Sequence, residues 1–169
     1  VAIVTNAGGP GILAVDSCVA HGLEVPELQP ETQAQLRTLL PPHASVVNPV
    51  DLTAPASAEA YRQAIPLVAH DPVVDAVIVI YLPPMRVPSE EVARAIVDAA
   101  RDVNALGKPV AAVFLSSHGI PEALRAPDVR VPSYAFPEAA AIALARAAQY
   151  AAWRERPITP TPAFPDIRR

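Results

Sequence analysis

The first sixteen residues hold the feature that most constrains how this chain can fold. An apolar run over residues 1–5 is followed at once by Asn6-Ala7-Gly8-Gly9-Pro10-Gly11, and a helical pattern begins at Ile12. This order predicts a buried strand, a glycine-rich turn and a helix. We expect the glycines to allow backbone angles and close approaches that a Cβ would forbid, and Pro10 to fix the chain near the first helical turn.

The start of this helix predicts a binding site for an anion. Backbone N–H groups there lack partners within the helix, and the positive end of the helix dipole favours negative charge by about 0.3–1 kcal/mol at an exposed position. The loop is not a Walker A motif, which needs Gly-Lys-Ser/Thr at the helix start, and its spacing does not fit the G-x-G-x-x-G dinucleotide fingerprint. A glycine turn that only packs a helix closely on a strand remains the alternative.

Composition excludes several classes of protein. The chain has 169 residues, 51% of them hydrophobic, and no apolar run reaches the roughly 18–20 residues of a membrane span. A net charge of −4 with scattered arginines argues against nucleic acid as a partner. Cys18 is the only cysteine, which excludes an internal disulfide and favours a reducing compartment. We therefore expect a cytoplasmic protein with neither a membrane nor a nucleic-acid partner.

Strand and helix patterns alternate along the chain. Ser57 is placed to cap a helix that runs to about His70, and Pro30 and Pro137 stand where first-turn prolines would. This alternation predicts an α/β fold, a three-layer α/β/α flavodoxin-like sandwich with a parallel five-stranded sheet in the order 2-1-3-4-5. The expected strands are residues 1–5, 76–82 and 110–116, with weaker candidates at 23–28 and 129–135, and the other expected helices are residues 31–40, 89–106 and 138–154.

The two ends of the chain predict a piece of a larger protein. Val1 already stands inside a strand pattern with no initiating methionine, and residues 157–169 are rich in proline and have no apolar period. We expect one domain over residues 1–156 and an interdomain linker over residues 157–169.

A second polar segment lies in the middle of the chain. Asn48 precedes Pro49 and is therefore pushed toward extended geometry, so a stiff loop presents its side chain and that of Asp51. Such a loop can support a functional site. Asx turns, in which both side chains bond to neighbouring backbone, are the alternative.

These segments together resemble one protein family. Residues 5–16 read TNAGGPGILAVD, Leu40-Pro41-Pro42 follows, and Asn48-Pro49-Val50-Asp51-Leu52 comes next. In this order and spacing they resemble the nucleoside-diphosphate-forming acyl-CoA synthetases, over nearly the whole chain. That family includes ADP-forming acetyl-CoA and succinyl-CoA synthetases. It also includes bacterial protein lysine acetyltransferases, in which the same modules are fused to an acetyltransferase domain.

The resemblance implies a role in a multidomain ligase. The chain is similar to the flavodoxin-like module that follows the CoA-binding and phosphohistidine-bearing modules and precedes or partners the ATP-grasp module. In that family a histidine on the neighbouring module carries phosphate between the acyl phosphate and the nucleotide. The matching phosphate-binding residues here are Asn6, Ala7, Gly8, Gly9 and Gly11, through backbone amides, with Asn48 and Asp51 in a supporting loop.

The resemblance also implies what this domain does not do alone. CoA, ATP or ADP, and Mg²⁺ are expected in the full-length acid–thiol ligase, with none of them bound by this domain by itself, and the isolated domain is expected to be inactive. Two other functions stay open. One is a regulatory or scaffold module of a lysine acetyltransferase. The other is a stand-alone flavodoxin-like binding domain, for which only Tyr81 and Phe114 supply aromatic rings at the strand ends.

Other reactive residue types have simpler interpretations. His118, in Ser116-Ser117-His118-Gly119, resembles the pattern around the catalytic histidine of the family, but Ile120-Pro121 replaces the expected small polar residues. A solvated loop histidine is the alternative, and no catalytic residue is assigned in this chain. We expect Cys18 to be a small core residue, and Tyr150 and Trp153 to complete packing or meet a neighbouring domain. No His, Cys or Asp cluster has the spacing of metal ligands.

Overall fold

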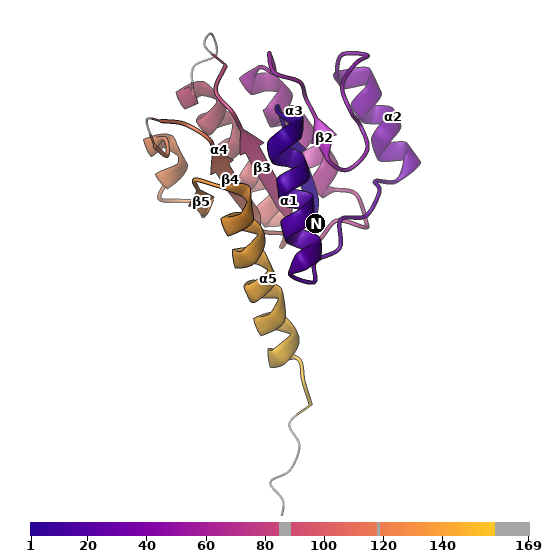
Figure 1. Cartoon of the computed structure of the whole chain (residues 1–169), viewed down its shortest axis with the longest axis vertical. Helices are drawn as coiled ribbons and strands as arrows, with labels where there is room; N and C mark the ends of the chain where they lie inside the picture. Colours follow the sequence, from indigo (N-terminus) through magenta and orange to yellow (C-terminus); the bar gives the residue numbers. More distant parts are fainter. Residues whose placement is uncertain (85–88, 118, 158–169) are drawn as a thin grey trace, which may run out of the picture.

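The chain forms a five-stranded parallel sheet covered by helices on both faces (Figure 1). The computed structural model describes residues 1–84, 89–117 and 119–157. The strand order is β2-β1-β3-β4-β5, and every neighbouring pair is parallel, so the predicted fold and order are confirmed. The elements are β1 Ala2–Thr5, α1 Gly8–Ala20, α2 Pro30–Leu39, β2 Val50–Asp51, α3 Ala58–Ala69, β3 Val77–Tyr81, α4 Ser89–Ala105, β4 Val110–Phe114, the 3₁₀ helix η1 Glu122–Arg125, β5 Ser133–Tyr134 and α5 Pro137–Arg154.

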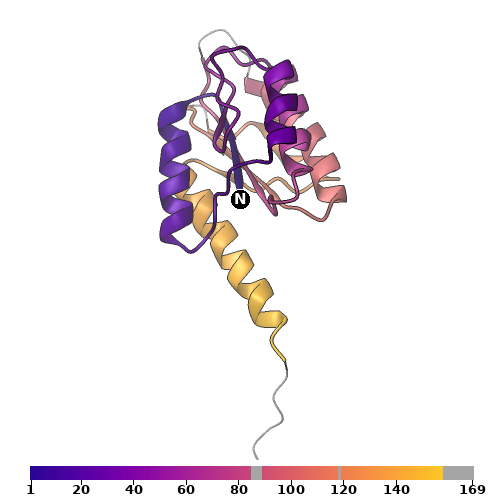
Figure 2. The ribbon, with the colours of Figure 1, turned by 90° about the vertical axis from the view of Figure 1, so that its right-hand side faces the viewer.

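Helices α1 and α5 cover one face of the sheet, and α2, α3 and α4 cover the other (Figure 2). Because both faces are covered, the central strands β3 and β4 are buried along their whole length and consist of nearly continuous apolar residues. Ile78 and Ile80 face the smaller core beneath α1 and α5, whereas Val77, Val79 and Tyr81 face the larger core beneath α3 and α4. The sandwich has one core on each side of its sheet.

The helix starts follow the predicted signals. Ser57 is the N-cap of α3, and its Oγ accepts a hydrogen bond from the Ala60 N–H at 3.2 Å. Pro30 and Pro137 occupy the first turns of α2 and α5, where their missing N–H groups cost no helical bond. These local signals were sufficient to predict where α2, α3 and α5 begin, whereas α1 begins at Gly8, four residues before the predicted start at Ile12.

The strand predicted at residues 23–28 is wrong, because β2 takes that edge of the sheet. Residues 23–28 contain no strand, and Val50 and Asp51 pair with Val4 and Thr5 of β1 instead. Pro26 lies inside the expected strand and has no N–H to donate to a ladder. Its carbonyl instead accepts a bond from the Asn48 side chain at 2.9 Å.

Three aromatic side chains at the ends of the strands and on α3 are buried. Tyr61 and Tyr81 meet edge to face with ring centroids 5.8 Å apart, and Phe114 lies 5.3 Å from Tyr81. The Tyr61 hydroxyl donates to the Ile80 carbonyl at 2.9 Å. Since Tyr81 and Phe114 belong to the core, they offer no exposed ring on which a flavin could stack.

The far half of α5 differs from the rest of the molecule. Tyr150 and Trp153 stack with their centroids 5.8 Å apart, and each is about 60% exposed. The expectation that they complete the packing of this domain is therefore wrong.

No helix in the described residues is long and apolar enough to cross a membrane. Residues 158–169 lie outside the described residues, so the predicted linker stays a prediction.

Candidate functional site

A hollow of about 440 Å³ lies at the carboxyl edge of the sheet, where helix α1 begins. It is bordered by the segments that follow β1, β2 and β3, which is where ligands of open α/β sheets bind. The residues that line it are Asn6, Ala7, Gly8, Asp51, Thr53, Ala54, Leu82, Pro83 and Pro84.

The glycines belong to the first turn of α1 and not to a turn before it. Helix α1 begins at Gly8, and Gly8, Gly9 and Gly11 all have the negative φ of a normal helix. The expectation that they are needed for unusual backbone angles is therefore wrong. The described glycines with positive φ lie elsewhere, at Gly22, Gly107 and Gly119.

A side chain would meet different surroundings at each of the three glycines. A Cβ on Gly11 would lie 3.1 Å from Thr5 Cγ2, so this glycine lets α1 pack closely on β1. A Cβ on Gly8 would lie 3.4 Å from the Asp51 carboxylate, and a Cβ on Gly9 would have nothing within 4 Å. The packing interpretation thus holds for Gly11, whereas the space beside Gly9 is open.

Two of the expected backbone donors are used within the protein, and two others are available to a ligand. The Ala7 N–H donates to Thr5 Oγ1 at 3.0 Å, and the Gly11 N–H donates to the Ala7 carbonyl at 3.2 Å. Gly8 and Gly9 are exposed, and their N–H groups have no helical acceptor because they stand in the first turn. Ala7 is the N-cap and has no side chain that could bond to them.

The Asn6 side chain shapes the site without facing a ligand. Asn6 is 3% exposed, and its Nδ2 donates to the Leu82 carbonyl at 2.9 Å while its Oδ1 accepts from the Leu82 N–H at 2.9 Å. A longer contact of 3.4 Å joins Nδ2 to the Ala54 carbonyl. Both polar atoms of the amide are therefore used to hold the segments after β1, β2 and β3 together.

The structure separates Asn48 from Asp51. The Asn48 side chain bonds to backbone at the start of β1: Oδ1 accepts from the Ile3 N–H, and Nδ2 donates to the Val1 carbonyl, both at 2.9 Å. Asn48 does not line the hollow, and its side-chain hydrogen bonds stabilise the sheet. These bonds do not form the Asx turn that was the alternative for this residue.

Asp51 does line the hollow and stands against the start of α1. Its Oδ1 accepts from the Thr53 N–H at 2.9 Å, which is the Asx turn that was the alternative for this residue. Its other oxygen, Oδ2, faces Gly8. A carboxylate at this position is stabilised by the positive end of the helix dipole and competes with any other anion for it.

Thr53 was not predicted and is the most unusual residue of the hollow. Its φ is 70°, in the left-handed region that β-branched residues rarely adopt. Its Oγ1 is buried and has no hydrogen-bond partner within the described residues. Strained backbone and an unpaired buried hydroxyl are both features that gather at functional sites. Neither can be read from the sequence, because both depend on how the chain turns after β2.

Among the described residues, the remaining candidates add no second centre. Cys18 is buried, and its burial raises the pKa of the thiol, which makes it a poor nucleophile. His118 lies outside the described residues. Among the residues that the structure describes, no three His, Cys, Asp or Glu side chains are close enough to hold a metal ion.

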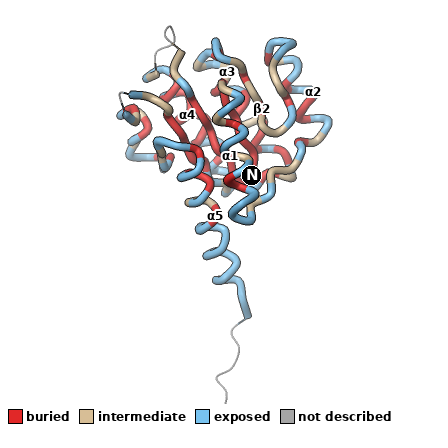
Figure 3. The backbone as a smooth tube through the Cα atoms, viewed as in Figure 1, coloured by how far each residue is buried: buried red, intermediate tan, exposed pale blue. Residues whose placement is uncertain are grey.

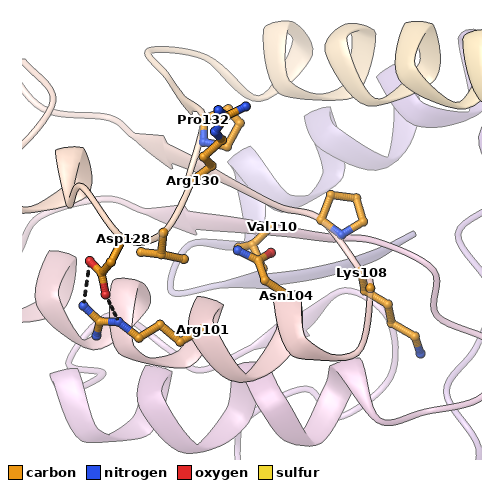
Figure 4. Close-up of a pocket in the computed structure, with 10 residues that line it drawn as sticks. Arg101, Asn104, Lys108, Val110, Asp128, Arg130 and Pro132 are labelled. Carbon is orange, nitrogen blue, oxygen red and sulfur yellow. Dashed lines mark hydrogen bonds and ion pairs between the residues drawn. The ribbon is translucent and has the colours of Figure 1, made fainter.

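A larger hollow, of about 580 Å³, lies beside the amino end of β4 (Figure 4). It carries several cationic side chains, but two of them are engaged within the protein. Arg101 Nε donates to Asp128 at 2.8 Å, and Lys108 Nζ donates to the Ala69 carbonyl at 2.7 Å. We therefore assign the functional site to the hollow at the carboxyl edge.

Comparisons with known sequences identify the family of the chain. The Ligase-CoA domain matches residues 1–157. The alpha subunit of ADP-forming acetate–CoA ligase II from Pyrococcus furiosus is 40% identical over 150 residues, which cover 80% of this chain and 32% of that protein. ADP-forming acetate–CoA ligase I from Archaeoglobus fulgidus is 31% identical over 124 residues, which cover 73% of this chain and 17% of that protein.

Solved structures agree with the sequence comparison. A crystal structure from Pyrococcus horikoshii OT3 superposes with a TM-score of 0.77 at 40% identity, covering 86% of this chain and 34% of its own. The dinucleotide-forming acetyl-coenzyme A synthetase 1 of Ca. Korarchaeum cryptofilum, solved with phosphate and ADP, has a TM-score of 0.77 at 30% identity, covering 90% and 33%. This chain thus spans about a third or less of the length of these relatives. From its sequence match and its fold, the chain belongs to the Ligase-CoA domain family.

Proposed function

We propose that this chain is a module of an ADP-forming acyl-CoA synthetase, and that the start of α1 binds the phosphoryl group of a phosphohistidine carried by a partner module. One observation carries the proposal: the uncapped N–H groups of Gly8 and Gly9 are exposed at the edge of a hollow at the carboxyl ends of the strands. Such helix starts bind phosphate through their amides and their dipole.

The arrangement of donors suits a group that arrives on another module. The open space beside Gly9 leaves room for an approaching imidazole and its phosphoryl group. Thr53 lines the same hollow, and its buried Oγ1, which has no partner among the described residues, is the candidate for a third donor. Each charge-assisted bond is worth about 1.5–3 kcal/mol, so two or three of them can hold the group during transfer.

The Asp51 carboxylate weakens the binding of a phosphoryl group at this site. Its carboxylate is already placed at the same helix end, and it repels a second anion there. A site with this arrangement holds a phosphoryl group less tightly than the amides alone would. Weak retention suits a group that must move on to another acceptor.

In the proposed reaction, acyl-CoA, ADP and phosphate are converted reversibly to carboxylate, CoA and ATP. Phosphate attacks the thioester, the C–S bond breaks and CoA leaves, which gives an acyl phosphate. The histidine nitrogen takes the phosphoryl group and releases the carboxylate, and ADP then takes that group to form ATP. The residues of this chain hold the group between these two transfers. CoA, nucleotide and Mg²⁺ are bound by other modules, and the assembly works in the cytoplasm.

The proposal is tested with the polypeptide that carries this module, purified with its partner subunits. Supplied with acetyl-CoA, ADP and phosphate, it should form ATP and an acid-labile phosphoenzyme. The 169-residue chain by itself should form neither ATP nor thioester, because the histidine, CoA and nucleotide sites lie on other modules. Thioester synthesis by the 169-residue chain alone would overturn the proposal.

A further inference from the structure

The two helical layers of this molecule have very different outer surfaces. Ten large hydrophobic side chains are exposed among the described residues, and seven of them belong to α1, to α5 or to the residue that caps α5. These seven are Ile12, Leu13, Val19, Phe136, Ile142, Tyr150 and Trp153. We call the surface that they form on these two neighbouring helices the α1–α5 face.

Helix α1 is apolar on both of its sides. Its exposed positions are 8, 9, 12, 13, 16, 19 and 20, which form one continuous stripe at helical spacing. Asp16 is the only charged residue of the helix, and Ile12 and Val19 are both 61% exposed. A helix that is apolar all round is normally buried on all sides.

Helix α5 continues this apolar surface past the body of the domain. Its first half packs on α1 and the sheet, whereas every residue from 146 to 157 is exposed (Figure 3). Three charged residues stand on its 18 positions, and the stacked pair of Tyr150 and Trp153 lies on the exposed half. Stacked aromatic rings on an exposed helix are typical of protein interfaces.

The opposite layer shows what a solvent-facing surface of this protein looks like. Helix α4 alone carries six charged residues, and its exposed positions include Arg94, Asp98 and Arg101. Charged pairs there, such as Arg101 with Asp128 and Arg62 with Glu59 on α3, lie in the open. The contrast is between two layers of one domain, so it does not come from overall composition.

We propose that the α1–α5 face is an interface with another module of the same acyl-CoA synthetase. That module contributes a surface of apolar side chains from outside these 169 residues. The proposal rests on the proposed function only for the identity of the partner.

Two observations favour another module over a second copy of this chain. The relatives are about three or more times as long as the segment that matches, so in them further chain is attached to this module and is present at high effective concentration. The α1–α5 face is also continuous with the start of α1, where Gly8 and Gly9 are exposed. These two residues are the proposed binding site for a phosphoryl group carried by a partner module. A module seated on this face therefore stands next to the proposed phosphoryl site.

The proposal is tested by measuring how fast single cysteines react with a maleimide in the native, complete assembly. Leu13→Cys and Ile142→Cys probe the α1–α5 face, and Leu106→Cys at the end of α4 is the matched control. In the module alone these leucines are similarly exposed, at 49% for Leu13 and 41% for Leu106. We expect labelling at positions 13 and 142 to be about tenfold or more slower than at 106, because a covered thiol reacts only when the interface opens. Equal rates at all three positions would overturn the proposal.

The occupant is identified by crosslinking from the same cysteines with a maleimide reagent that carries a photoreactive diazirine. A crosslinked peptide from outside residues 1–169 supports the proposal, and a peptide from residues 1–169 of a second copy overturns it. Neither readout needs turnover, so an inactive enzyme with a protected face would disprove the proposed function and leave this inference standing. If one variant does not fold, as judged by circular dichroism, Val19→Cys replaces it on the same stripe.

Discussion

The side chain of Asn6 and the backbone of Leu82 form a closed ring of two hydrogen bonds, each 2.9 Å long. The two residues are 76 positions apart in the sequence, and they follow the neighbouring strands β1 and β3. An asparagine amide can match a peptide group in this way because it offers one acceptor and one donor side by side. The ring fixes the floor of the hollow at the carboxyl edge.

Replacing Asn6 by alanine should therefore destabilise the protein. The change leaves the N–H and carbonyl of Leu82 without their partners in a partly buried place, and we expect a loss of about 1–3 kcal/mol in the free energy of unfolding. Urea unfolding followed by circular dichroism measures it. The control is Asn104→Ala on exposed α4, which should stay within about 0.5 kcal/mol of wild type. Equal midpoints for the two variants would contradict a structural role for Asn6.

Gly9→Val should separate function from stability. The side chain would enter the open space beside the free amides, and losing two charge-assisted bonds predicts roughly a hundredfold or greater fall in the phosphoenzyme. The free energy of unfolding should change by less than about 1 kcal/mol, because valine suits a helix better than glycine does. Phosphoenzyme levels and thermal unfolding are measured on the complete enzyme, with Ala20→Val at the other end of α1 as control. Affinity for CoA should not change.

Gly11→Val should show the reverse pattern. Its Cβ would lie 3.1 Å from Thr5 Cγ2, and we expect overpacking between α1 and β1 to cost about 1–3 kcal/mol. Thermal unfolding of Gly11→Val beside Gly9→Val measures the difference. A Gly11 variant as stable as the Gly9 variant would show that the contact between α1 and β1 relaxes freely.

Thr53→Val tests the unpaired hydroxyl. The two side chains have the same shape and the same backbone preference, so the variant removes only a buried Oγ1 that has no partner among the described residues. The protein should be as stable as wild type or more so, because an unsatisfied buried hydroxyl costs about 1–3 kcal/mol. Phosphoenzyme should fall by about tenfold or more if the hydroxyl donates to the phosphoryl group. Thr53→Ser keeps the donor and should retain it. Unchanged phosphoenzyme in Thr53→Val would exclude the hydroxyl as a ligand.

The stability of the fold should depend on the charge of Asp71. Burial alone would raise the pKa of this carboxyl, but bonds from the Val73 N–H, the Thr32 hydroxyl and the Gln29 N–H, with the charge of Lys108, outweigh it and hold the pKa below its ordinary value. A lowered folded pKa stabilises the protein above the unfolded Asp pKa of about 3.9, and this contribution is lost as the pH falls through the folded value.

Asp71→Asn should therefore lower the free energy of unfolding by about 1.5–3 kcal/mol at pH 7, and by much less near pH 2. Urea unfolding at the two pH values measures this dependence. Asp102→Asn, an exposed change on α4, should show no comparable dependence on pH. A loss of equal size at both pH values would mean that the charge of Asp71 contributes nothing.

The fold was predictable from sequence because its signals are local. The apolar runs of β1, β3 and β4 and the capping residues Ser57, Pro30 and Pro137 each fix one element, and the handedness of crossovers then fixes the strand order. The edge strand β2 was not predictable, because it has only two residues and is completed by the side chain of Asn48. A pattern of strand residues cannot show that a side chain replaces a strand partner.

The candidate site was predictable only in its position. The glycine-rich stretch predicted a helix start at the carboxyl edge, but which amides remain free depends on Thr5 Oγ1, which occupies the Ala7 N–H. The strain at Thr53 depends on how the chain turns after β2. The exposure of Tyr150 and Trp153 depends on how far α5 extends beyond the sheet (Figure 1). All three follow from tertiary geometry.

The residue before α1 has a consequence for how this helix is completed. Ala7 stands where most helices place Ser, Thr, Asp or Asn, and a capping side chain there adds about 0.5–2 kcal/mol to the stability of a helix. Helix α1 lacks that contribution by itself, so a bound phosphoryl group would serve as its cap, and each departure of the group would uncap the helix again. In Ala7→Ser, the serine hydroxyl would cap helix α1 in place of the phosphoryl group. The variant would then be more stable than wild type and would bind phosphate less tightly.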